Sequence, residues 1–176
     1  MDLILVVDES TRMDMHERSV ISFLTSLVSE MSISDTQTHV SLGLFRTMGH
    51  EQFDLDAHMS IESLTAAISH IRFHGGYGDI EAGISYAVND AMTHAAGDRP
   101  DVPNVVVIIT ADGDRNFGGH LFALEHEIHL KSDNVILIEL GHVSIDHLAT
   151  DNGHELRLQW IDEDTVDDVL DLICPY

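Results

Sequence analysis

Short runs of consecutive apolar residues alternate along this chain with longer segments in which apolar residues recur every three or four positions. Unbroken apolar runs rich in β-branched residues are typical of strands buried on both faces. The spacing of three and four predicts amphipathic helices. We expect strands at residues 3–7, 39–45, 105–109, 135–140 and 156–160, a short edge strand at 51–55, and helices at 15–31, 61–71, 80–91, 121–130, 145–150 and 162–173.

The order of these elements predicts the fold class. Strands that alternate with helices favour parallel strands, because each helix carries the chain back across the sheet. We therefore expect an α/β fold, a doubly wound and mainly parallel six-stranded sheet flanked by helices on both faces. Residues 97–103 are polar and hold two of the three prolines, which indicates a loop. No repeat, linker or low-complexity tract divides the chain, so we expect a single domain over residues 1–176.

The charge of the chain restricts its partners. The 176 residues include 31 Asp and Glu but only 8 Lys and Arg, a formal net charge of −23. Such a surface repels nucleic acids and anionic lipids. No apolar run reaches the ~18 residues of a membrane span, so we expect neither nucleic-acid binding nor direct membrane insertion. No basic segment precedes an apolar one, which predicts no signal peptide here; a secreted protein would then carry its leader outside this chain.

Several side chains are expected to have structural or solvent-exposed roles. We interpret Glu9, Asp14, Asp54, Asp56 and the acidic residues of 162–171 as a solvated face. We expect Trp160 and the six phenylalanines in the core. His126 and His129 share one helix face beside Glu125 and Glu127, and this pattern fits solvated residues better than a transition-metal site. Ser10 lacks the surroundings of a catalytic serine, so the sequence predicts no catalytic residue and no enzyme.

Oxygen-bearing side chains follow the two central strands. Asp8, Glu9 and Ser10 come after the first apolar run, and Thr110 and Asp112 come after the second. Ligands of such sheets bind beyond the carboxyl ends of the strands. A dinucleotide would need glycines there, whereas carboxylates and hydroxyls suit a hard divalent cation such as Mg²⁺, Mn²⁺ or Ca²⁺. We expect Asp8, Ser10 and Asp112 to converge there.

These motifs resemble a known family. Asp8-Glu9-Ser10 and its preceding strand resemble the D-x-S-x-S motif of the von Willebrand factor A domain, also called the integrin I domain. Residues 64–87 resemble the family's double-glycine segment, and residues 106–113 resemble its I-T-D-G strand end. Residues 135–141 and 148–149 resemble two segments that come later in the family's sequence. The resemblance implies the family's doubly wound fold. It also implies a metal-ion-dependent adhesion site, in which an acidic side chain of a protein ligand completes the coordination of the ion.

The resemblance assigns metal ligands position by position. Asp8, Ser10 and Asp112 match family ligands, but Arg12 replaces the last serine of the motif and Gly78 occupies the threonine position. Asp79, next to Gly78, could supply an oxygen instead. An arginine cannot ligate a cation and competes with one. Two readings stay open: a degenerate site that binds a divalent cation through Asp8, Ser10, Asp79 and Asp112, or an inactive site in which Arg12 pairs with Asp8 or Asp112.

The resemblance implies a non-enzymatic adhesion or protein-binding module of an extracellular or matrix protein. This module would recognise its partner protein through an acidic side chain of that partner. The alternative is a structural domain with an inactive site, whose acidic surface serves matrix assembly or calcium and mineral contact. A cytoplasmic scaffold is a third reading. Cys174 resembles a cysteine at the end of extracellular A domains that often pairs with one before the first strand. This chain offers no such partner, so either the partner lies outside it or the thiol is free and the domain is intracellular.

Overall fold

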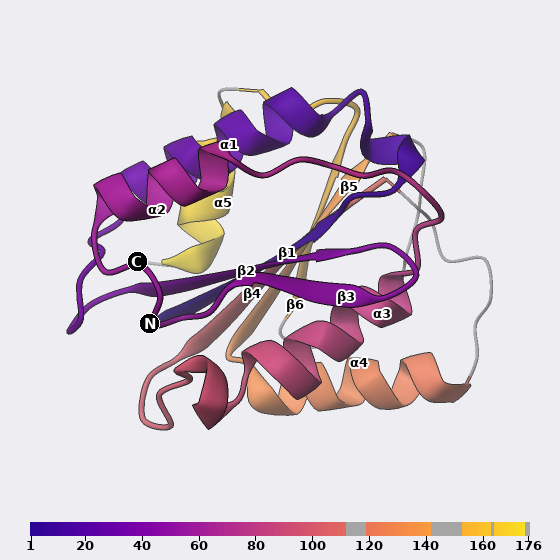
Figure 1. Ribbon diagram of the computed structural model, residues 1–176. Coiled ribbons are helices and arrows are strands. Elements are labelled where there is room, and N and C mark those ends of the chain that lie inside the picture. The colour runs from indigo at the N-terminus through magenta and orange to yellow at the C-terminus, as the bar shows by residue number, and fades with distance from the viewer. Residues whose placement is uncertain (112–118, 142–152, 163, 175–176) are drawn as a thin grey trace.

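Six strands form one sheet that lies between two layers of helices (Figure 1). The computed structural model describes residues 1–111, 119–141, 153–162 and 164–174. The strand order is β3-β2-β1-β4-β5-β6, parallel throughout except that β3 pairs antiparallel with β2. The strands are β1 (Asp2–Asp8), β2 (His39–Phe45), β3 (Gly49–Phe53), β4 (Asn104–Thr110), β5 (Asn134–Leu140) and β6 (Gly153–Leu158). This sheet confirms the predicted fold class.

Helices cover both faces of the sheet. In Figure 1 α1, α2 and α5 lie on one face and α3 and α4 on the other. Their bounds are α1 (Glu17–Ser29), α2 (Ile61–Ser69), α3 (Ile80–Tyr86), α4 (Gly119–Lys131) and α5 (Asp164–Ile173), with short 3₁₀ turns η1 (Thr11–Met13) and η3 (His94–Ala96) and a π-helical turn η2 (Ala87–Ala91). The helix predicted at 145–150 lies outside the described residues.

Several predicted elements differ in their bounds: the strand expected at 156–160 is Gly153–Leu158, and the helix expected at 80–91 is α-helical only to Tyr86. Two other differences have a clear cause. The helix expected from residue 15 begins at Glu17, because η1 comes first and His16 takes the N-cap position of α1. The edge strand expected at 51–55 occupies Gly49–Phe53, since it follows β2 through a tight turn. Both differences arise from turns, whose geometry the hydrophobic pattern does not record.

Residues of β1 alternate between two cores. Leu3, Leu5 and Val7 pack toward α1, α2 and α5, whereas Ile4 and Val6 pack toward α3 and α4. The central position of β1 and β4 accounts for their unbroken apolar runs, as predicted. On the second face, α3 approaches β2 closely: a Cβ added at Gly83 would lie 2.7 Å from the ring of Phe45. This contact fixes the helix that begins next to Asp79.

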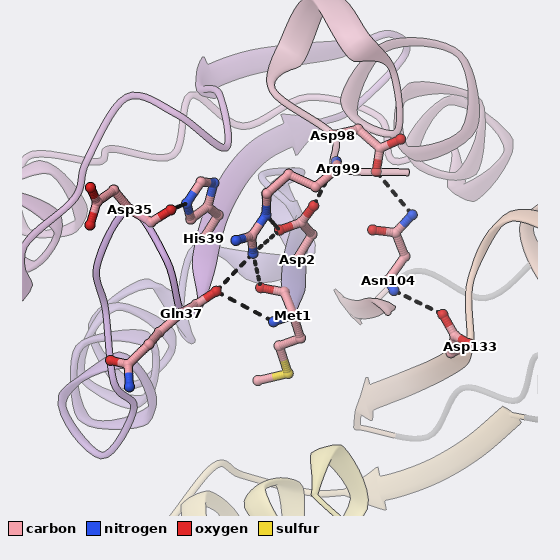
Figure 2. Close-up of polar contacts among 9 residues, drawn as sticks. All are labelled: Met1, Asp2, Asp35, Gln37, His39, Asp98, Arg99, Asn104 and Asp133. Atoms are coloured by element: carbon pink, nitrogen blue, oxygen red, sulfur yellow. Dashed lines mark hydrogen bonds and ion pairs between the residues drawn. The ribbon is translucent and has the colours of Figure 1, made fainter. Parts of the chain in front are cut away.

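A network of polar contacts closes the amino-terminal ends of the strands (Figure 2). The Asp2 side chain is fully buried, and the Arg99 Nε and Nη2 atoms donate to its Oδ1 at 2.8 and 2.5 Å. Arg99 Nη2 also donates to the carbonyl oxygens of Met1 (2.9 Å) and Gln37 (2.8 Å). A single guanidinium thus joins the loop after η3 to β1 and to the turn before β2.

Two expectations about aromatic residues are wrong. Trp160 and Phe122 are each 51% exposed, whereas Phe23, Phe45 and Phe53 are buried and Phe73 is partly buried. Trp160 follows β6, an edge strand, so much of it meets solvent, and its ring contacts the His16 ring at a centroid distance of 4.9 Å. Phe117 lies outside the described residues. Cys174 is a free, exposed thiol.

Candidate metal centre

Asp8 ends the central strand β1 and is fully buried. Its Oδ1 accepts the Ser10 N–H at 2.7 Å, and its Oδ2 accepts the Thr110 hydroxyl at 2.9 Å and the Ala111 N–H at 3.4 Å. Thr110 lies on β4, the parallel neighbour of β1. These donors hold the carboxylate in one orientation at the carboxyl edge of the sheet. The sequence did not assign Thr110 this role, although a hydroxyl at the end of a central strand is a usable signal.

The electrostatics of Asp8 favour a cation. Burial raises the pKa of this carboxyl, although hydrogen bonds from Ser10, Thr110 and Ala111 act in the opposite direction. No cationic side chain pairs with Asp8 within the part of the chain that the structure describes. Ser10 Oγ is also buried and has no hydrogen-bond partner among those residues. A buried carboxylate beside a buried hydroxyl oxygen fits a hard divalent cation.

Asp112 lies outside the described residues. Ala111, the residue before it, donates its N–H to Asp8. The convergence of Asp112 with Asp8 and Ser10 therefore stays a prediction.

Asp79 caps the amino terminus of α3, where its Oδ1 accepts the Glu81 N–H at 3.1 Å. The loop before it is held against the first motif: the Gly76 N–H donates to Thr11 Oγ1 at 2.8 Å, and the Thr11 N–H donates to the Gly76 carbonyl at 3.0 Å. The double-glycine loop thus lies beside the residues that follow Asp8. Gly78 is buried and Arg12 is exposed. Whether Asp79 ligates an ion stays a prediction.

Glu9 is fully buried, so its assignment to a solvated face is wrong. The His74 Nδ1 and backbone N atoms lie 2.8 and 3.1 Å from its Oε2, and Arg46 Nε and His50 Nε2 lie 3.2 and 3.7 Å from its Oε1. These partners come from the turn after β2, the start of β3 and the double-glycine loop. Because they are distant in sequence, periodicity could not reveal them.

Exposed apolar side chains surround this end of the sheet. Four of the large ones come from its loops: Met15 after η1, Met48 between β2 and β3, Tyr77 in the double-glycine loop, and Trp160 after β6. Large exposed apolar side chains on the loops at one end of a sheet are typical of protein-binding surfaces.

Among the described residues, the two α4 histidines, His126 and His129, have no third side chain placed to complete a metal site. His126 is exposed and His129 is half-buried. The described residues contain no group of three or more His, Cys, Asp or Glu side chains placed to hold a metal ion. Within the same residues, no helix is long and apolar enough to cross a membrane.

Comparison with known proteins places residues 2–159 in the family model of the von Willebrand factor type A domain. Integrin alpha-1 of Gallus gallus is 37% identical over 116 residues, which cover 65% of this chain and 40% of the integrin. Matrilin-1 of Bos taurus is 30% identical over 115 residues, 64% of this chain and 21% of matrilin-1. The chain thus spans less than half the length of these relatives.

A solved structure has a similar fold. It is that of proximal thread matrix protein 1 from the mussel byssus, with zinc in its MIDAS motif, the metal-ion-dependent adhesion site. It superposes with a TM-score of 0.85 at 20% identity and covers 98% of this chain and 48% of that chain. Manganese-loaded TRAP protein of Plasmodium vivax superposes with a TM-score of 0.72 at 16% identity, over 99% of this chain and 72% of that chain.

Proposed function

The chain belongs to the von Willebrand factor type A domain family, and from this premise we propose that it is a non-enzymatic module that binds a protein through a divalent cation. Asp8, Ser10 and Asp112 hold the ion, with Asp79 as a further oxygen donor. When bound, the ion supplies a positive centre that accepts a carboxylate of the partner. The observation that carries the proposal is the buried Asp8 carboxylate, which receives only neutral donors from the described residues and lies beside the buried Ser10 hydroxyl.

The residues of this chain have separable roles in that binding. Thr110 and the Ala111 N–H orient the Asp8 carboxylate, so it needs little rearrangement when the ion arrives. Met15, Met48, Tyr77 and Trp160 offer apolar contact around the ion. The net charge of −23 repels an acidic partner elsewhere on the surface. The cation therefore directs such a partner to this edge of the sheet.

We assign the module to an extracellular or matrix protein, because its relatives include integrin alpha-1 and matrilin-1. The state of Cys174 in the native protein tests this assignment. Mass spectrometry that finds this thiol in a disulfide supports an extracellular location, and a fully reduced thiol in freshly isolated protein contradicts it.

The second candidate is a structural domain whose site holds no ion. The observations that favour it are Arg12 and Gly78, which replace two family ligands. The two candidates differ in one measurable property, which is the response of the folded protein to divalent cations.

Thermal unfolding in Mg²⁺, Mn²⁺ or Ca²⁺, compared with chelator at constant ionic strength, measures that response. An ion at about ten times its Kd stabilises the folded state by ~1.4 kcal/mol, which raises the Tm by ~3–6 °C for a chain of this size. We expect this shift in the unmodified protein. An unchanged Tm at millimolar ion refutes the proposal.

Matched variants separate the site from general screening of the acidic surface. Asp8→Asn is expected to abolish the shift, because an amide is a poor ligand for a hard cation. Asp14→Asn removes the same charge from an exposed position in the same loop and is expected to keep the shift. Equal shifts in both variants indicate screening rather than a site.

A further inference from the structure

The turn between β2 and β3 contains a hollow of about 270 Å³ lined by Arg46, Thr47, Met48, Gly49 and His50. We propose that this hollow receives a second acidic side chain of the same partner whose first carboxylate binds the cation. The proposal rests on the proposed function, because it places the second acidic group beside the metal centre. It adds a chemical requirement for the partner: two acidic residues close together in one extended segment.

The hollow begins at the end of the strand next to that of Asp8. Phe45 pairs in register with Asp8, and the Glu9 N–H donates to the Phe45 carbonyl at 2.9 Å. Arg46 therefore lies one residue beyond Phe45, which pairs with Asp8. The two strands are about 5 Å apart across the sheet. The Arg46 side chain adds a similar length, which places the hollow on the order of 10 Å from Asp8. In an extended peptide, side chains two or three residues apart span roughly 7–10 Å.

The charge of the hollow complements an acidic group. Arg46 Nε faces the buried Glu9 Oε1 at 3.2 Å, and the Arg46 side chain is 45% exposed. Among the described residues, the terminal nitrogens of Arg46 have no protein acceptor, so they can donate to a carboxylate that enters from solvent. His50 lies on the same side of Glu9. Its neighbour Glu51 points to the opposite side of β3, because side chains alternate along a strand.

Glu9 and Met48 give the hollow its other properties. The buried Glu9 forms an ion pair with Arg46 through Nε alone, which leaves the two terminal nitrogens for a ligand. Met48 is 74% exposed at the lip, where a flexible thioether can pack against the methylene groups of an entering side chain. On a chain with only eight Lys and Arg, a cation fixed at the metal-binding edge of the sheet is a specific device for recognising acidic groups.

Short peptides test the requirement for two acidic residues. The probes are acetylated, amidated glycine peptides with one glutamate, or with two glutamates separated by one or two glycines. Amide chemical shifts of the full chain report their binding in millimolar Mg²⁺ at constant ionic strength. We expect a two-glutamate peptide to bind ~3–10-fold more tightly than the one-glutamate peptide, and the amides of residues 46–50 to shift only with the former.

Two pairs of variants locate the gain in affinity. Arg46→Gln removes the guanidinium, and its control Arg18→Gln removes an exposed arginine on α1. Thr47→Asp places a negative charge at the lip without touching Glu9, and its control Thr36→Asp adds the same charge to an exposed residue at the opposite end of the strands. We expect the gain to vanish in Arg46→Gln and Thr47→Asp and to persist in both controls. Should Arg46→Gln unfold, Thr47→Asp alone decides.

The possible results distinguish this inference from the proposed function. Equal affinities for the two kinds of peptide, or a gain that persists in Thr47→Asp, overturn the second acidic site and leave metal-dependent binding intact. Absence of any Mg²⁺-dependent binding of the one-glutamate peptide overturns the proposed function, and the second site with it.

Discussion

Replacing Arg99 with alanine tests whether the network at the amino-terminal ends of the strands holds the fold together. The guanidinium donates to the buried Asp2 carboxylate and to the carbonyl oxygens of Met1 and Gln37 (Figure 2). Arg99→Ala leaves Asp2 with the backbone N–H of residue 99, which donates to Oδ2 at 2.9 Å. The negative charge of Asp2 then stays buried without its paired guanidinium.

The structure sets the size of the effect. Removing one member of a buried ion pair costs ~3–5 kcal/mol. The bonds to the two carbonyl oxygens add ~0.5–1.5 kcal/mol each, but the partial exposure of the Arg99 side chain lets water replace part of what is lost. We therefore expect Arg99→Ala to lower the free energy of unfolding by ~3–5 kcal/mol and the Tm by roughly 8–15 °C.

Urea unfolding followed by circular dichroism measures this change. Asp2→Asn and the double variant complete a double-mutant cycle. We expect the summed losses of unfolding free energy in the two single variants to exceed the loss in the double variant by ~2 kcal/mol or more. Arg18→Ala, on the exposed face of α1, serves as control and should change stability by less than ~0.5 kcal/mol. A cost below ~1 kcal/mol for Arg99→Ala, or additive effects in the cycle, would refute the reasoning.

Three further predictions concern other parts of the fold. Burial lowers the pKa of His16, so the folded state binds a proton more weakly than the unfolded chain. The free energy of unfolding should therefore fall as the pH drops below 6.5, by at most ~1.4 kcal/mol per pH unit. Urea unfolding at several pH values measures this slope, which should be flatter in His16→Phe. Gly83→Ala should destabilise by ~1–2 kcal/mol despite its better helix propensity, because its Cβ would overlap the Phe45 ring, and a Tm that rises contradicts this. Under the proposed function, Arg12→Ser restores a family ligand and should enlarge an existing Mg²⁺-dependent Tm shift, whereas a shift that appears only in the variant indicates an inactive native site.

The sheet could be predicted from the sequence because burial on both faces leaves a strong signal. The runs before Asp8 and Asp112 are uninterrupted, and both strands lie in the middle of the sheet. Trp160 shows where the same reasoning fails. Its size and apolar ring favour the core in general, but it follows an edge strand, where it stays 51% exposed beside the His16 ring. Composition gives a tendency, and position in the sheet decides the outcome.

The candidate site was only partly predictable, for a related reason. Asp8 and Ser10 could be identified because they follow a central strand, and the ends of such strands meet at one edge of the sheet. Glu9 was misassigned because its partners Arg46, His50 and His74 come from distant loops. Glu9 lies between the candidate ligands Asp8 and Ser10, and the sequence alone does not indicate whether its side chain faces solvent or the protein.

Three buried carboxylates on and directly after β1 show how structure and function divide along one strand. Asp2 pairs with Arg99 and Glu9 pairs with Arg46, each a cation supplied by this chain. Asp8 receives only neutral donors from the described residues, and burial raises its pKa. A buried carboxylate without a compensating cation is costly, and among the described residues Asp2 and Glu9 each have such a cation whereas Asp8 has none. Asp2 and Glu9 therefore serve the fold, whereas Asp8 has the electrostatics of a residue that receives its cation from solution.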